Sequence, residues 1–263
     1  MSFSKQMLSP IWASDEVHDS ECAPSFIGLG TPKTGTSWWF ELLLQHPLIE
    51  SNQFNVKETC YFCHAWSENQ NDQFLNGYRK GFKKAEANII SGEWSTLYFS
   101  HPYALERVVE AFPDIKFFLT FRSPLPMFYS WLNQLMRNRA RSMLKESEEA
   151  RFMYLNYDAV PSLFSQISIF PQRLHWLKKK VGDNLLCLQY EKNVIDTQGQ
   201  IDRCMVHLGL PSFEVKSAEV RVNKADENLV QDLKIPAVTK DALKETGEEL
   251  LKLCPDFDEA LWK

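Results

Sequence analysis

The sequence predicts an α/β fold in which a central parallel sheet is flanked by helices. Three observations lead to this expectation. Short apolar runs alternate with segments of helical periodicity, proline opens two of the predicted helices, and a loop rich in glycine and hydroxyl groups joins the first strand to the first helix. Strands that alternate with helices favour a parallel sheet whose ligand lies at the carboxyl ends of the strands.

The composition sets the broad class of the protein. The chain has 263 residues, of which 44% are hydrophobic and 24% are charged, so it can bury a full core in one large domain or two small ones. A net charge of −5, from 29 basic and 34 acidic residues, gives no global field that would attract nucleic acid or an anionic membrane. We therefore expect neither partner, and we expect a local site to hold any anion that binds.

The first half of the predicted domain alternates strands with helices. Residues 25–30 (SFIGLG) form a short apolar run that ends in glycine, which predicts a buried strand. Residues 36–46 carry apolar side chains at helical spacing before Pro47 and predict a helix. A second strand is expected at residues 89–90, and a helix that begins with proline is expected over residues 102–112.

The second half repeats this alternation. Residues 116–121 (KFFLTF) predict a buried strand, and residues 124–139 predict a helix that again starts at a proline. We expect residues 171–180 to end a longer helix and residues 184–189 (NLLCLQ) to form another core strand. The amphipathic residues 241–253 predict a last helix.

These elements divide the chain into three expected parts. Residues 1–23 form an N-terminal segment, residues 24–215 the domain, and residues 216–263 a C-terminal helical segment that packs on the same domain. The highly charged residues 139–149 (RARSMLKESEE) predict a surface loop or an exposed helix. The N-terminal segment lacks the apolar core of a signal peptide, and no apolar run approaches the ~18 residues of a membrane span, so we expect a cytoplasmic protein.

The most informative segment is residues 30–37 (GTPKTGTS), between the first predicted strand and the first predicted helix. Backbone N–H groups at a glycine-bearing turn and at a helix N-terminus form an anion site. Lys33 adds a positive charge, and Thr34, Thr36 and Ser37 add hydroxyl donors. The alternative is an ordinary turn between a strand and a helix.

This loop differs from the loop that binds ATP with Mg²⁺. Gly30 and Gly35 have the required separation, but Thr36 stands where that loop has its lysine, and Lys33 comes earlier. The strand at residues 116–121 runs into Arg122 instead of the aspartate that usually holds Mg²⁺. A cation at that position predicts a second phosphate contact and no metal site.

Four segments in order resemble the motifs of sulfotransferases that use 3′-phosphoadenosine 5′-phosphosulfate (PAPS). They are residues 32–37 (PKTGTS), similar to the 5′-phosphosulfate loop, residues 57–62 (KETCYF), residues 92–98 (GEWSTLY), and residues 121–124 (FRSP) with 129–131 (YSW), similar to the 3′-phosphate motif. The resemblance is closest to the heparan-sulfate-type and bacterial branch. It implies a P-loop NTPase-like fold and metal-independent transfer of the sulfuryl group from PAPS.

The resemblance also implies roles for individual residues. The implied PAPS-binding residues are Pro32, Lys33, Thr34, Gly35, Thr36 and Ser37 at the 5′-phosphate, and Arg122 and Ser130 at the 3′-phosphate. Lys33 would also stabilise the leaving phosphate, and Glu58 would act as the general base, with His101 in reserve. The structural alternatives are a surface ion pair between Glu58 and Lys57 and a helix start at His101.

Three positions depart from the family pattern, and one loop of the family is missing. Trp94 and Thr96 replace a lysine and a proline in the third segment, which argues against a highly sulfated or acidic acceptor. Met127 replaces an arginine in the 3′-phosphate helix, which is expected to weaken nucleotide binding. No clear copy of the family's C-terminal glycine-rich basic loop is present, and Arg221 and Lys224 are its substitutes, with plain surface charge as the alternative.

A second motif competes with these assignments. Residues 60–64 (CYFCH) match a haem-attachment pattern and also half of a zinc site, and the two cysteines could form a redox pair. No export signal and no second pair of ligands accompany the motif, and its residues overlap the KETCYF segment. We expect neither haem nor a metal here.

Two other functions remain open on the sequence alone. One is a small-molecule kinase that uses ATP and Mg²⁺ on a divergent phosphate loop, and the other is a binding module without activity. For the sulfotransferase, the expected acceptor is a hydroxyl or amine of a small-molecule natural product or a carbohydrate. The sequence does not indicate an oligomeric state.

Overall fold

The computed structural model describes residues 22–63, 72–83, 89–142, 147, 154–216, 230 and 233–263. Its centre is a five-stranded sheet in the order β2-β3-β1-β4-β5, and all four strand pairs are parallel. The strands are β1 (Phe26–Gly30), β2 (Ile49–Ser51), β3 (Ile90–Trp94), β4 (Lys116–Phe121) and β5 (Leu185–Gln189). The expected α/β fold with a central parallel sheet is confirmed.

Helices connect these strands and cover the sheet. They are α1 (Thr36–Leu43), α2 (Asp72–Arg79), α3 (Leu97–Ser100), α4 (Pro102–Ala111), α5 (Pro124–Ser142), α7 (Val160–Ser168), α8 (Phe170–Val181), α9 (Tyr190–Ile195), α10 (Thr197–Leu208) and α11 (Ala237–Leu253). Shorter helical turns are η3 (Tyr61–Cys63), η4 (Leu155–Ala159), η5 (Gly182–Asn184) and η6 (Glu259–Trp262). None of the helices among the described residues has both the length and the apolar character that a bilayer crossing requires.

The predicted elements and the observed ones agree in order. The sequence predicted one long helix that ends at residue 180. The structure has two helices there: α7, which ends at Ser168, and α8, which begins at Phe170. The charged segment at residues 139–149 begins as the last turn of α5, and most of the remainder lies outside the described residues. Strand β2 and helices α2, α3 and α9 were not predicted, because they are short.

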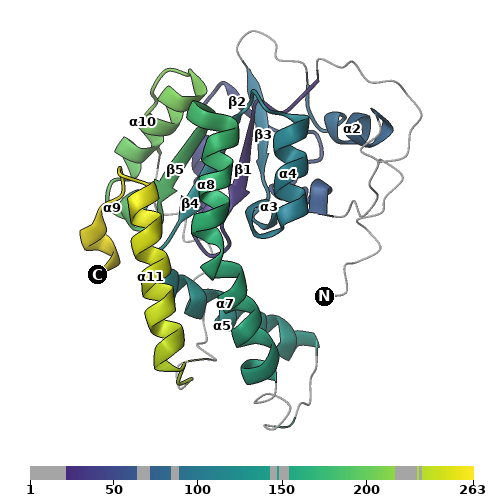
Figure 1. Ribbon diagram of the computed structural model, residues 1–263. Coiled ribbons are helices and arrows are strands. Elements are labelled where there is room, and N and C mark those ends of the chain that lie inside the picture. Colours follow the sequence, from purple (N-terminus) through teal and green to yellow (C-terminus); the bar gives the residue numbers. More distant parts are fainter. Residues whose placement is uncertain are drawn as a thin grey trace.

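The two faces of the sheet form separate cores because successive side chains of a strand point to opposite faces. Phe117 and Leu119 of β4 belong to a cluster with residues of α4, α5, α7, α8 and α11. Phe118, between them, packs in a second cluster with residues of α1 and α10. Figure 1 shows α4 and α8 lying across the near face of the sheet. The result is a three-layer arrangement of helices, sheet and helices.

The C-terminal part packs on this domain. Helix α11 contacts α5, α7 and α8, and Figure 1 shows it beside them at one end of the molecule. Gln189, at the end of β5, exchanges two hydrogen bonds with the backbone of Asp258, at 2.8 and 2.7 Å. Trp262 Nε1 donates to Glu191 Oε2 at 2.8 Å. The last turns of the chain therefore lie beside the carboxyl end of β5.

The strand order indicates that a ligand binds at one edge of the sheet, the edge formed by the carboxyl ends of the strands. Strand β1 is central, with β3 on one side and β4 on the other. The connection that follows β1 leads to β2 on the β3 side, and the connection that follows β3 crosses to β4 on the other side. Ligands of open parallel sheets bind where the connections diverge in this way. The loop at residues 30–37 and Arg122 both follow strands that end at this edge.

Candidate active site

A cavity of about 350 Å³ lies at this edge. It is lined by Pro32, Lys33, Gly35, Thr36, Ser37, Trp38, Glu58, Thr96, Leu97, Arg122, Ser130, Trp131, Gln134, Leu135, Asn138 and Tyr190. These residues follow β1, β2, β3, β4 and β5 or lie on α5, so every strand of the sheet contributes to the site. The volume is in the range of small-molecule sites.

The loop after β1 is held in an open turn. Thr31 donates from its backbone N at 3.0 Å and from its hydroxyl at 2.8 Å to the carbonyl of Thr120 on β4. Gly35 has φ +73°, and a Cβ there would lie 3.0 Å from the ring of Tyr190. Because Gly35 is the N-cap of α1 and offers no side-chain cap, the first N–H groups of this helix are left for a ligand.

Three cations gather beside this loop. Lys33 Nζ donates to Gln134 Oε1 at 2.7 Å, and Arg122 Nη1 approaches the Lys33 carbonyl at 3.4 Å. Burial, and then the charges of Arg137 and Arg122, lower the pKa of Lys33 below its ordinary value of 10.5. Crowding of like charges costs free energy, and a multiply charged anion bound among them would relieve it.

Arg122 is itself poised for a ligand. Its guanidinium carbon lies 4.8 Å from the centroid of the Tyr190 ring, and its buried Nε has no hydrogen-bond partner among the described residues. A guanidinium binds phosphate through charge-assisted hydrogen bonds. Ser130 lies on α5 and also lines the cavity. The structure therefore brings together the two residues that the sequence assigned to one phosphate.

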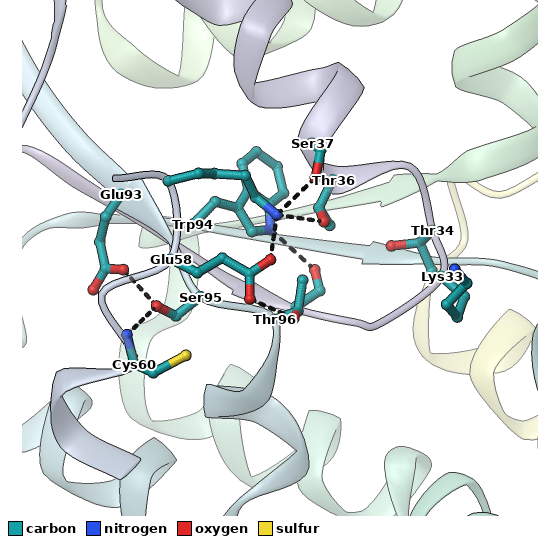
Figure 2. A network of polar contacts seen from close by, with 12 residues as sticks. Lys33, Thr34, Thr36, Ser37, Glu58, Cys60, Glu93, Trp94, Ser95 and Thr96 are labelled. Atoms are coloured by element: carbon teal, nitrogen blue, oxygen red, sulfur yellow. Dashed lines mark hydrogen bonds and ion pairs between the residues drawn. The ribbon is translucent and has the colours of Figure 1, made fainter. Parts of the chain in front are cut away.

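Glu58 lies at the other end of the cavity in a tight polar network (Figure 2). Its Oε1 accepts from Lys57 Nζ at 2.5 Å, and its Oε2 accepts from the Thr96 hydroxyl at 3.1 Å. Lys57 Nζ also donates to Thr36 Oγ1 at 3.1 Å and to Ser37 Oγ at 3.2 Å. The ion pair with Lys57 is present, but Glu58 itself lines the cavity, and Lys57 joins it to the loop after β1.

A buried carboxylate supports the segment that carries Glu58. Glu93, on β3, has no exposed surface, and burial raises its pKa. Its two oxygens accept hydrogen bonds from the Thr59 backbone N at 3.1 Å, the Thr59 and Tyr78 hydroxyls at 2.8 Å, the Tyr98 hydroxyl at 2.8 Å and the Ser95 hydroxyl at 2.5 Å. Because Thr59 follows Glu58 directly, this network fixes the backbone beside the proposed base.

Most of the predicted site residues line the cavity. Those that line the cavity are Pro32, Lys33, Gly35, Thr36, Ser37, Glu58, Arg122 and Ser130. Thr34 is buried, and its hydroxyl donates to the Thr31 carbonyl at 2.7 Å, so its side chain braces the loop. His101 is the N-cap of α4, where its Nδ1 accepts from Ala104 N at 3.3 Å, and it does not line the cavity. Arg221 and Lys224 lie outside the described residues.

Trp94 and Met127, two of the residues that depart from the family pattern, are both buried in the core. Trp94 is fully buried, stacks on Phe118 and directs its Nε1 at the Gly30 carbonyl, so it is a core residue and does not face the cavity. Met127 is also fully buried, and its sulfur lies 3.6 Å from the Thr31 hydroxyl. Neither position therefore contacts the cavity's contents.

Some residues that line the cavity were given no part in the site from the sequence: Leu97, Gln134, Leu135, Asn138 and Tyr190. Trp38, Thr96 and Trp131 also line it. Lys57 was expected only as the ion-pair partner of Glu58, and it contacts the Thr36 and Ser37 hydroxyls from outside the lining. One signal was available: Ser130, Gln134 and Asn138 are spaced by four residues, which places them on one face of α5. Tyr190 follows the last predicted strand directly.

The cysteine motif belongs to the support of the site. Cys60 is buried, and its backbone N donates to the Ser95 hydroxyl at 2.9 Å. A hydrogen bond with Cys60, together with burial, raises the pKa of Cys63 well above its ordinary range. His64 lies outside the described residues. In the described part of the chain, no three His, Cys, Asp or Glu side chains are grouped to hold a metal ion.

A model of the sulfotransferase domain family matches residues 24–240. The chain belongs to this family. The family and the fold agree with the resemblance carried by the four sequence motifs. The match continues beyond residue 215, so it includes the start of helix α11.

Relatives and known structures support this assignment. The chain is 29% identical over 129 residues to the membrane-associated sulfotransferase kil1 of Dictyostelium discoideum and 31% identical over 132 residues to a mouse bifunctional heparan sulfate N-deacetylase/N-sulfotransferase. These matches cover 45% and 46% of the chain, but only 25% and 14% of the two relatives.

Two solved structures share the fold over most of the chain. A sulfotransferase from Alicyclobacillus acidocaldarius superposes with a TM-score of 0.63 at 19% identity, covering 92% of this chain and 99% of the other. The sulfotransferase domain of an olefin synthase from Synechococcus superposes with a TM-score of 0.53 at 14% identity, covering 90% and 97%.

Proposed function

We propose that this protein transfers the sulfuryl group of PAPS to a hydroxyl or amine of a small molecule or carbohydrate. The observation that carries the proposal is that Lys33 and Arg122 lie together at the open loop after β1, with Glu58 in the wall of the same cavity. The family and the four sequence motifs support it.

The residues of the cavity fit a nucleotide with two separate phosphates. The N–H groups at the start of α1 and the Lys33 ammonium would hold the 5′-phosphosulfate, and Arg122 with Ser130 would hold the 3′-phosphate. Trp38 and Tyr190 line the same cavity, and their rings would stack with the purine. The phosphates would replace the neutral Gln134 oxygen as the partner of Lys33.

The residues also fit the chemistry of an in-line transfer. Glu58 would accept the proton of the acceptor group as the new bond to sulfur forms, and Lys33 would stabilise the negative charge that grows on the departing phosphate oxygen. The products are the sulfated acceptor and adenosine 3′,5′-bisphosphate. The remaining task of the site is to position donor and acceptor, which the fixed loop and the Glu93 network accomplish.

The lining of the cavity favours a partly apolar acceptor. Leu97, Trp131 and Leu135 supply apolar surface, and Asn138 supplies an uncharged polar group. Among the described lining residues, the cations are Lys33 and Arg122, both assigned to the donor. A neutral hydroxyl compound with an apolar body therefore fits better than a polysulfated chain.

The test is sulfate transfer from radiolabelled PAPS in the presence of EDTA. A panel of 2-naphthol, octanol and glucosamine samples aromatic, aliphatic and carbohydrate acceptors. We expect a labelled product with at least one of them, and we expect its formation to require Lys33. Turnover of ATP with Mg²⁺, together with no transfer from PAPS, would overturn the proposal in favour of a kinase.

A further inference from the structure

One charged side chain at the site has no role in the transfer described so far. Lys57 follows β2 in the chain, and its carbonyl accepts a hydrogen bond from Trp94 N at 2.8 Å, which fixes its backbone against the end of β3. Its side chain is 16% exposed, so the ammonium is largely withdrawn from solvent. A withdrawn ammonium needs acceptors for its three protons.

The three acceptors belong to the two halves of the site. Thr36 Oγ1 at 3.1 Å and Ser37 Oγ at 3.2 Å belong to the phosphate loop, and Glu58 Oε1 is the third. All three side chains line the cavity and point toward one another in Figure 2. Lys33, by contrast, lies well apart from Glu58 in the same view.

These contacts fix the polarity of the two hydroxyls. A hydroxyl has one proton to donate and lone pairs to accept. Because Thr36 and Ser37 accept from Lys57, their own protons are free to donate into the cavity, where an anion would receive them. The same ammonium holds one oxygen of Glu58, whose other oxygen accepts from Thr96.

We propose that Lys57 is the positioning residue that couples the donor loop to the base: it turns the Thr36 and Ser37 hydroxyls into donors for the phosphosulfate and holds Glu58 beside them. This inference rests on the proposed function. It assigns to Lys57 an action through its three neighbours, in contrast to the direct contact proposed for Lys33.

The test is a mutant cycle read by calorimetric titration with adenosine 3′,5′-bisphosphate in EDTA. Lys57→Met removes the three donated hydrogen bonds, and Thr36→Val with Ser37→Ala removes the hydroxyls. We expect each change alone to weaken binding about tenfold. Combined, they should weaken it little more than Lys57→Met alone, because hydroxyls that nothing orients contribute little. Losses that multiply to about a hundredfold would overturn the proposal.

A kinetic readout separates positioning from general damage. With the best acceptor of the panel, Lys57→Met should raise KM for PAPS and lower kcat while leaving KM for the acceptor within about twofold. An equal rise in both KM values would contradict the proposal. Lys83→Met, which removes an exposed ion pair with Glu50, is the matched control and should change neither.

Two further comparisons keep the result interpretable. Urea unfolding of each variant checks that it folds, and Lys57→Gln repeats the cycle with a polar side chain in case the methionine variant does not. If wild type fails to bind the bisphosphate, the proposed function itself fails. If wild type binds it and the losses in the cycle multiply, only the role of Lys57 fails.

Discussion

The phosphate loop lines the cavity, whereas the segment behind Glu58 is buried beside it, and the charged groups of these two regions have different partners. At the loop, Lys33 has a neutral amide as its partner and two arginines as charged neighbours. Behind Glu58, the buried carboxylate of Glu93 accepts five hydrogen bonds. Charge that the protein leaves uncompensated indicates where a ligand completes the site, whereas compensated charge holds the frame.

The largest effect is expected at the residue between these two regions. Glu58→Gln keeps the shape of the side chain but removes the base, so sulfate transfer should fall by roughly 100-fold or more. Binding of the bisphosphate should stay within about threefold, because the phosphates are held elsewhere. Transfer assays and calorimetry on the same sample check both results, with the exposed carboxylate variant Glu50→Gln as control. Unchanged transfer would show that another group is the base.

The compensated region should matter most for stability. Glu93→Ala leaves the donors of Thr59, Tyr78, Ser95 and Tyr98 buried without their acceptor, and we expect the free energy of unfolding to fall by about 3 kcal/mol or more. Urea unfolding measures this loss, and Glu93→Gln, which keeps one acceptor oxygen, should lose less. A loss below about 1 kcal/mol for the alanine variant would mean that this network does not hold the frame.

The uncompensated region should behave in the opposite way. Lys33→Met removes a cation from beside Arg122 and Arg137, so the ligand-free protein should be unchanged or more stable by less than about 1 kcal/mol. The same variant should lose the stabilisation that a saturating bisphosphate gives to wild type, which is about 2.7 kcal/mol at one hundred times Kd. Thermal unfolding with and without the nucleotide checks both expectations. A destabilised free protein would assign Lys33 to the frame.

The smallest effect concerns pH. The pKa of Lys33 is lowered in the folded protein, so between that value and 10.5 the unfolded chain binds more protons than the folded one. The free energy of unfolding should therefore rise with pH over this window, and below it the charged Lys33 is a constant cost. Urea unfolding at several alkaline pH values should show the rise in wild type and a smaller one in Lys33→Met. Identical slopes would contradict the lowered pKa.

The sequence alone predicted the fold and the meeting of Lys33 and Arg122 at one cavity, because both depend on local patterns. The run KFFLTF and the loop GTPKTGTS each signal their structure within a few residues. The first is β4 and the second follows β1, and these strands are neighbours in the sheet, so their adjacent ends meet as expected for parallel strands. Local patterns were therefore sufficient to assign Lys33 and Arg122 to one site.

The support of the site could not be predicted in the same way. Glu93 meets Thr59 and Tyr78 only because β3 pairs with β1 and β2 and the chain folds back over their ends. The buried environment of Trp94 was not predicted, for a related reason: its side chain alternates with that of Glu93 along β3 and enters the core on the other face. His101 was considered as a base because it follows the GEWSTLY segment closely in the sequence. In the structure it is the N-cap of α4 instead.

The central claim is that the cations of the phosphate loop form a metal-free site for a nucleotide with two phosphates. Calorimetric titration with adenosine 3′,5′-bisphosphate in EDTA, beside a titration with ATP and Mg²⁺, tests it most directly. The account predicts tight binding of the bisphosphate that is abolished in Lys33→Ala and in Arg122→Ala. Absence of bisphosphate binding, or binding of ATP only with Mg²⁺, would contradict it.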